Sequence, residues 1–194
     1  ADNGVHTFAN LAVFFKAGDQ TLMATDASDS TITGTQTVSV SAAAAASMTV
    51  GGFPTTDTAG DDHGFTVSLL DPYGNLASGY TGTVTLSSSD GNAALPGPYT
   101  FTAADAGAHT FDVTLKTAGA QTITANDGTF TEDEAVTVVP AAAFTVKVAG
   151  FPSSITAGDP GSFTVSIFDQ FGNPANNYLG TIDFTSSDPQ ATFA

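Results

Sequence analysis

The feature that most constrains this chain is an internal repeat of about a hundred residues. Gly52-Phe53-Pro54 returns as Gly150-Phe151-Pro152, an offset of 98 residues, and further motifs return at the same offset. They are Thr58–Asp61 with Thr156–Asp159, Phe65–Ser68 with Phe163–Ser166, Asp71-x-x-Gly74-Asn75 with Asp169-x-x-Gly172-Asn173, and Ser88–Asp90 with Ser186–Asp188. At the amino terminus, Ala1–Phe8 match Ala104–Phe111 at an offset of 103. Such a fixed period is typical of proteins built from copies of one structural unit.

The repeat divides the chain into one complete unit and two partial ones. The complete unit is expected over residues 48–143 and is called the middle unit. Residues 1–43, the first half-unit, match its last three expected strands, and residues 144–194, the last half-unit, match its first three. Joined end to end, the two half-units would lack only the equivalents of residues 97–103. They are therefore complementary, and the chain is either a window on a longer array or a molecule whose halves are completed by its neighbours.

The local pattern of the middle unit is that of β-strands. Phe65, Val67 and Leu69 alternate with Thr and Ser, which is the period of a strand with one apolar face. Turn residues such as Asn126-Asp127-Gly128 recur every ten residues or so. Strands are expected near 48–53, 64–70, 79–87, 98–103, 108–116, 120–125 and 134–139. About seven short antiparallel strands per unit predict an all-β fold of tandem immunoglobulin-like β-sandwiches.

A resemblance follows from these motifs. The Asp-x-x-Gly-Asn hairpins at 71–75 and 169–173, each followed by a Thr-rich strand, resemble the bacterial immunoglobulin-like repeats of invasin- and intimin-type surface proteins. Tyr99–Asp105 and Lys116–Thr122 resemble repeats of very long bacterial cell-surface proteins. The resemblance covers essentially the whole chain. It implies tandem sandwiches, an extracellular or cell-surface location and a role as a spacer or adhesive module.

Charge and composition argue against several functional classes. Three Lys, no Arg and nineteen acidic residues give a net charge of −16, whereas binding to nucleic acid or to an anionic membrane requires a basic surface. The chain has no Cys, and no apolar run is long enough to span a membrane. It also lacks a Gly-x-Ser-x-Gly elbow and a His-Glu-x-x-His motif. An enzyme is therefore not expected.

The two Asp-x-x-Gly-Asn hairpins carry the residues that a tight turn needs. Gly74 can adopt a positive φ, and the side chains of Asp71 and Asn75 can bond to nearby backbone groups. Asp169, Gly172 and Asn173 take the same positions in the last half-unit. These residues are predicted to have a structural role in the turn.

The three His residues lie far apart in the sequence and have no His partner at metal-binding spacing. His6 and His109 are repeat equivalents, and His63 has no counterpart. We interpret all three as structural or solvent-exposed, and no cofactor is expected apart from one candidate cation.

That candidate is Ca²⁺, which prefers carboxylate and carbonyl oxygens. If tandem units meet pole to pole, acidic loops meet at each linker, and a cation there would neutralise them. The carboxylates expected at this pole are Asp61, Asp62, Asp90, Asp159 and Asp188. No contiguous Asp-rich calcium loop is present, and dispersed negative charge also keeps a protein soluble without any metal. Both interpretations stay open.

Residues 11–16 of the first half-unit differ from their equivalents in the middle unit. Leu11, Val13, Phe14 and Phe15 make this segment apolar on both faces, with two extra residues. It is either a bulge with one buried turn or a contact surface for self-association.

Half a sandwich cannot bury its apolar face alone. The half-units are therefore expected to be completed by neighbouring units of the same chain or of another copy, as a homopolymer or a long tandem array. Ser41–Ser47 and Pro140–Ala143 are short linkers without Gly, which favours a semi-rigid line of units. The predicted function is a structural repeat of an extracellular bacterial surface protein or filament that associates head to tail. The alternative is an adhesin module that binds a host or carbohydrate ligand through exposed loops.

Overall fold

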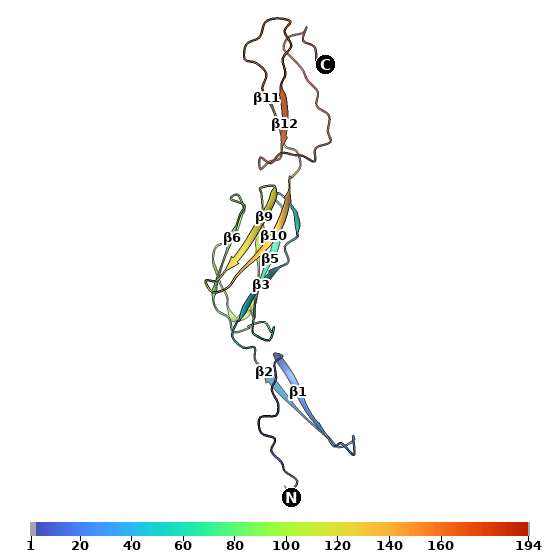
Figure 1. Cartoon of the computed structure of the whole chain (residues 1–194), viewed down its shortest axis with the longest axis vertical. Coiled ribbons are helices and arrows are strands. Elements are labelled where there is room, and N and C mark those ends of the chain that lie inside the picture. Colours follow the sequence, from blue (N-terminus) through green and yellow to red (C-terminus); the bar gives the residue numbers. More distant parts are fainter. Residues whose placement is uncertain (1–2, 194) are drawn as a thin grey trace.

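The structure, a computed structural model, describes residues 3–193. Ala1, Asp2 and Ala194, which belong to the expected half-units, lie outside the described residues. Figure 1 shows three parts along one long axis, with the sandwich of the middle unit between two smaller parts. A hairpin of β1 (Gly18–Thr25) and β2 (Thr33–Val40) lies toward the amino-terminal end, and β11 (Thr145–Ala149) with β12 (Thr164–Phe168) lies toward the other.

The middle unit consists of two sheets. One has the order β3-β5-β8, and the other has the order β4-β10-β9-β6-β7. Their bounds are β3 Ser47–Gly51, β4 Thr56–Thr58, β5 Asp62–Leu70, β6 Thr83–Ser88, β7 Tyr99–Thr100, β8 Ala108–Thr114, β9 Gly119–Asn126 and β10 Thr131–Val139. All pairs in these sheets are antiparallel except β4 with β10, which run parallel.

The core lies between these two sheets and follows from the alternation in the sequence. Phe65, Val67 and Leu69 of β5 are fully buried, while the Thr and Ser residues between them are partly exposed. The facing sheet contributes the other side of the core, with Val84, Leu86, Ile123, Ala125, Val136 and Val138. The predicted all-β sandwich is confirmed. A helix long and apolar enough to cross a membrane is absent from residues 3–193.

The first expected strand, 48–53, is divided into two. After β3 the chain turns at Gly52, which has a φ of +88°, and Pro54 cannot donate to a sheet. The chain then crosses to the other sheet, where β4 pairs with β10. The expected strand over 98–103 shortens to the two residues of β7, because a 3-10 turn, η1 (Ala103–Asp105), follows it.

Each half-unit forms two of its three expected strands. Residues 5–16 of the first half-unit and 181–186 of the last contain no strand. Their equivalents in the middle unit are β8, which pairs with β5, and β6, which pairs with β9. The residues described in each half-unit include no equivalent of that pairing partner. A strand without a neighbour leaves its backbone groups unpaired, so these segments are irregular.

Candidate functional site at the junctions between units

The Asp-x-x-Gly-Asn hairpin after β5 is a turn closed by its own side chain. Asp71 Oδ1 accepts hydrogen bonds from the backbone amides of Tyr73 and Asn75, both at 2.9 Å. Gly74 has a φ of +81°, which strains any residue with a side chain. The turn role predicted for Asp71, Gly74 and Asn75 corresponds to this geometry.

The same turn also contacts the preceding unit, which the turn pattern alone does not predict. Asn75 Nδ2 donates to the carbonyl oxygen of Phe15 at 2.7 Å, and Asn75 Oδ1 accepts from the amide of Ala17 at 2.9 Å. Asp71 Oδ2 accepts from the amide of Ala43, in the linker, at 3.0 Å. One turn thus binds both the first half-unit and the chain that leaves it.

The second junction repeats these hydrogen bonds. Asn173 Nδ2 donates to the carbonyl oxygen of Lys116 at 2.8 Å, and Asn173 Oδ1 accepts from the amide of Ala118 at 2.9 Å. Asp169 Oδ2 accepts from the amide of Ala141, in the second linker, at 3.0 Å. Both junctions therefore use a side-chain amide to pair with one amide and one carbonyl of the preceding unit, just before its next strand.

The ring packing differs between the junctions. Tyr73 packs on Phe15, with ring centroids 4.9 Å apart. Its equivalent, Phe171, lies instead against Gly60 in the turn after β4, where an added Cβ would come within 2.4 Å of Phe171 Cζ. The described residues of the first half-unit, 3–43, include no equivalent of β4 and its turn, and Tyr73 packs on Phe15 instead. A hollow of about 370 Å³ lies beside the second contact, between residues 58–61 and 141–144.

The carboxylates of the two turns are held in their ionised form. Burial alone would raise the pKa of Asp71, but hydrogen bonds from the Asn75 side chain and from the amides of Asn75, Ala43 and Tyr73 lower it to about 2. Burial would raise the pKa of Asp169 as well, but the equivalent hydrogen-bond donors lower it below its ordinary value. Both carboxylates therefore remain charged acceptors at neutral pH.

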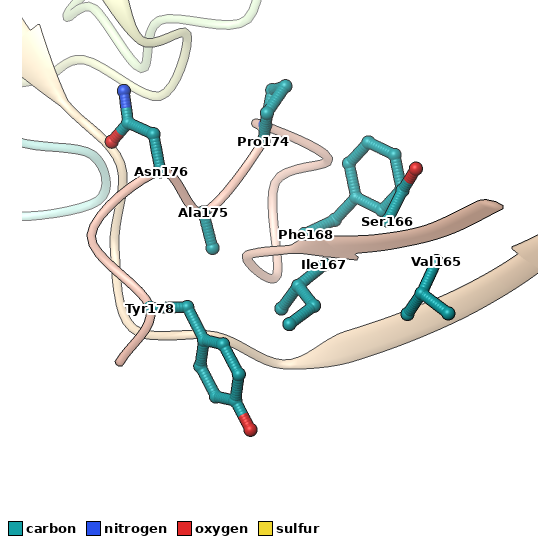
Figure 2. Close-up of a pocket in the computed structure, with 8 residues that line it drawn as sticks. All are labelled: Val165, Ser166, Ile167, Phe168, Pro174, Ala175, Asn176 and Tyr178. Atoms are coloured by element: carbon teal, nitrogen blue, oxygen red, sulfur yellow. The ribbon is translucent and has the colours of Figure 1, made fainter. Parts of the chain in front are cut away.

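The last half-unit exposes part of what would be its core. A hollow of about 370 Å³ is lined by Val165, Ile167 and Tyr178 among others, and Figure 2 shows these side chains. In the middle unit, the equivalent of Tyr178 is Tyr80, which packs edge-on against Phe101 at 5.2 Å and donates to Asp127 Oδ2 at 2.5 Å. Those partners come from the later part of the unit. The hollow therefore lies where the remaining strands of a sandwich would pack.

The predicted self-association segment lies at the first junction and is largely exposed. Leu11 and Val13 are 72% and 70% exposed, and Phe14 is half-buried. Phe15 supplies the ring that packs on Tyr73 and the carbonyl that accepts from Asn75. This segment is not a strand with a bulge, although self-association through it stays a prediction.

The five carboxylates predicted to bind Ca²⁺ take separate local roles. Both Asp90 oxygens accept hydrogen bonds within the middle unit, from Lys116, Thr117 and Asn92. Asp62 accepts from the Thr114 hydroxyl. Asp188 accepts from the amide of Gln190, and Asp159 closes a turn through its own amide. Asp61 lies beside Asp57 and His63, which form with it the one group of three candidate ligands found among residues 3–193. Calcium binding by the predicted set stays a prediction.

The three histidines lie in different environments. His109 stacks on Tyr99, and its Nδ1 lies 2.8 Å from Asp105 Oδ1, which places it within a polar cluster beside the core. His6 contacts the ring of Phe8. His63 Nε2 lies 3.0 Å from the buried carboxylate of Asp57. The sequence pattern did not identify Asp57 as a site residue. The signal that could have identified it is that an Asp stands where the last half-unit has Ile155.

No protein-family model matches the chain, and no curated protein matches it. Solved structures do match. The Escherichia coli adhesin FdeC is 19% identical with a TM-score of 0.51, over 82% of this chain and 53% of that one. Domains 4–9 of the surface layer protein SbsC are 24% identical with a TM-score of 0.40, over 74% and 23%. A glycosyl hydrolase family 2 member from Bacteroides cellulosilyticus is 16% identical with a TM-score of 0.46, over 63% and 18%.

The chain spans less than a fifth of the hydrolase and about half of the FdeC structure. At this level of identity, the likeness to FdeC shows the fold alone. It agrees with the two sheets described above.

Proposed function

We propose that this chain is a structural repeat region of an extracellular bacterial surface protein or filament. Its units are held at fixed positions in a line, and neighbouring repeats of the same chain or of another copy complete the half-units. The module acts through length and rigidity rather than through catalysis. Support for the surface location comes from the resemblance to bacterial immunoglobulin-like repeats; the fold shared with FdeC, described as an adhesin, agrees with it.

The observation that carries this proposal is the repeated junction. Asn75 and Asn173 make the same pair of hydrogen bonds to the preceding unit, and Asp71 and Asp169 each fix the linker. A flexible connection would not need two identical sets of bonds across separate linkers. A stiff array would, because one repeated contact propagates one repeated orientation.

Small-angle X-ray scattering on the purified chain tests the rigidity. The wild type is expected to scatter as an extended particle with the shape in Figure 1. Replacing Asn75 and Asn173 by Ala removes two junction hydrogen bonds at each site, each contributing about 1 kcal/mol. The double variant is expected to keep folded sandwich signals and to show a broad distribution of lengths.

Asn126→Ala is the matched control. Asn126 also bonds within a hairpin, to Gly128 and Thr131, and both of these hydrogen bonds lie inside the middle unit. It should leave the length distribution unchanged. A wild type that is already as flexible as the double variant would contradict the proposal.

Negative-stain microscopy tests completion between chains. Uniform filaments of the purified chain would support it, and folded, dispersed monomers at high concentration would count against it. The adhesin alternative, in which exposed loops bind a host or carbohydrate ligand, remains a prediction.

A further inference from the structure

Asp57 is an unusual residue for the middle of a sandwich. It lies on β4, and its side chain is fully buried. Neither carboxylate oxygen has a hydrogen bond of acceptable geometry within the described chain. A buried carboxylate loses its hydration, which is costly unless a nearby cation or hydrogen-bond donors compensate.

Two further side chains complete a group around this carboxylate. His63, at the start of β5, places Nε2 3.0 Å from Asp57 Oδ1, and its ring is held edge-on by Phe53 at 5.5 Å. Asp61 is exposed at the end of the turn that joins β4 to β5, where its amide bonds to the carbonyl of Thr58. One ligand atom from each of the three residues lies within 4.8 Å of the other two.

The repeat supplies an internal comparison. In the last half-unit, Asp159 keeps the position of Asp61, but Ile155 replaces Asp57 and Gly161 replaces His63. The ring of Phe151 occupies the space beside Gly161, within 2.6 Å of where a Cβ would lie. The buried carboxylate and the imidazole are thus absent together, and an apolar residue serves at the position of Asp57. Ile155 lies on a segment that forms no strand and is 44% exposed, whereas Asp57 lies on β4 and is buried.

From this geometry we infer that Asp57, Asp61 and His63 form a binding site for one divalent transition-metal cation of the Zn²⁺ type. An imidazole nitrogen with two carboxylate oxygens is a donor set that suits such ions, whereas Ca²⁺ prefers oxygen alone. Ligand atoms that share one Zn²⁺ lie about 3 to 4 Å apart, since each bond is about 2.0 to 2.2 Å. The three ligand atoms lie within 4.8 Å of one another, and the exposed side chain of Asp61 can rotate to bring its carboxylate oxygen to the shorter distance that Zn²⁺ requires.

The position of the site links it to the second junction. Asp61 directly follows Gly60, against which Phe171 of the last half-unit packs. A cation bound by Asp57 on β4 and His63 on β5 would fix the turn between these strands. It would therefore stiffen the surface on which the next unit docks.

Isothermal titration of the chelator-treated chain with Zn²⁺ tests the inference. One Zn²⁺ per chain with a micromolar dissociation constant is expected, and Ca²⁺ should not compete. His63→Gln should weaken Zn²⁺ binding about tenfold or more. Loss of a residue that only supports a metal ligand already weakens binding by that much, and loss of the ligand itself should have at least the same effect. In nuclear magnetic resonance spectra, Zn²⁺ should shift the imidazole signals of His63 and leave those of His6 and His109 in place.

Asp57→Ile, which introduces the residue of the last half-unit and removes the buried charge, is the second variant. It should abolish Zn²⁺ binding while the melting temperature without metal stays equal or rises. Asp159→Asn is the matched control and should bind as the wild type does. Equal Zn²⁺ affinity in wild type and His63→Gln would overturn the inference. No binding by the wild type, together with a stabilised Asp57→Ile, would also overturn it and leave a buried ion pair. Neither result depends on the rigidity or self-association of the array.

Discussion

The middle unit and the half-units carry nearly the same apolar residues but bury them very differently. Phe111 on β8 is 4% exposed, whereas its repeat equivalent Phe8 is 72% exposed. Met48 on β3 is 2% exposed, whereas its equivalent Val146 on β11 is 51% exposed. The sequence pattern is the same in each pair. Burial therefore depends on whether the facing sheet is present, and a strand pattern specifies a core only together with its partners.

The hydrogen bonds at the two junctions, in contrast, do not depend on whether the preceding unit is complete. Asn75 docks on a half-unit and Asn173 docks on a complete sandwich, yet both make the same two hydrogen bonds. These bonds join a side-chain amide to backbone groups at one short segment, so they do not need a filled core. The contact between units thus depends on one short segment, whereas the core of a unit depends on both of its sheets.

The largest effect is expected from a pair of Phe truncations, one in the core of the middle unit and one at its exposed repeat equivalent. Phe111→Ala should lower the free energy of unfolding of the middle unit by about 3–5 kcal/mol, because it leaves a cavity. Phe8→Ala should change it by less than about 0.5 kcal/mol, as substitutions at exposed positions do. Urea unfolding of both variants measures the two effects. A large cost for Phe8→Ala would show that the first half-unit is completed in solution.

A smaller effect is expected from Ala at the two equivalent glycines. Gly60 and Gly158 have φ values of +95° and +89°, so Ala costs similar backbone strain at both. Only at Gly60 does the added Cβ collide with Phe171. Gly60→Ala should therefore cost about 1–3 kcal/mol more, as overpacking does.

Thermal unfolding of the two variants measures this difference. Phe171→Ala in the Gly60→Ala background should recover most of the extra loss. If the stability is not recovered, a collision with Phe171 is not the cause of the extra loss in Gly60→Ala.

The smallest effect is a change in acid sensitivity. The pKa of Asp71 is about 2 in the folded chain, below its ordinary value of 3.8, so its ionised form stabilises the fold. That contribution is complete above pH 4 and is lost as the pH falls toward 2. Asp71→Asn should therefore flatten the dependence of the urea midpoint on pH between 4 and 2, relative to the wild type. An unchanged slope would mean that the Asp71 hydrogen bonds do not persist in solution.

The alternating strands were the predictable part of the fold. Phe65, Val67 and Leu69 on β5 show a clear period of two, and burial follows it. β4 was missed because Thr56-Asp57-Thr58 is short and polar and shows no alternation. Its pairing with β10 arises from the crossing at Gly52 and Pro54, which is a tertiary event.

The candidate sites were less predictable. Asn75 satisfies the requirements of a turn by itself, so its bonds to Phe15 and Ala17, 58 to 60 residues away, leave no further trace in a single sequence. The repeat could have indicated Asp57, because Ile155 stands at the equivalent position in the last half-unit. A polar residue that replaces an apolar one between repeats is the signal for such a site.

The parallel pairing of β4 with β10 determines how the middle unit would respond to tension. In a pulled array, force enters through the linker before β3 and leaves through the chain after Val139 at the end of β10. Because β4 and β10 run in the same direction, they are drawn past each other along their length. Their backbone hydrogen bonds, including Thr137 N to Thr55 O and Ala59 N to Val139 O, then share the load and must break together. The unit is thus connected in shear, the arrangement that resists extension better than opening one bond at a time.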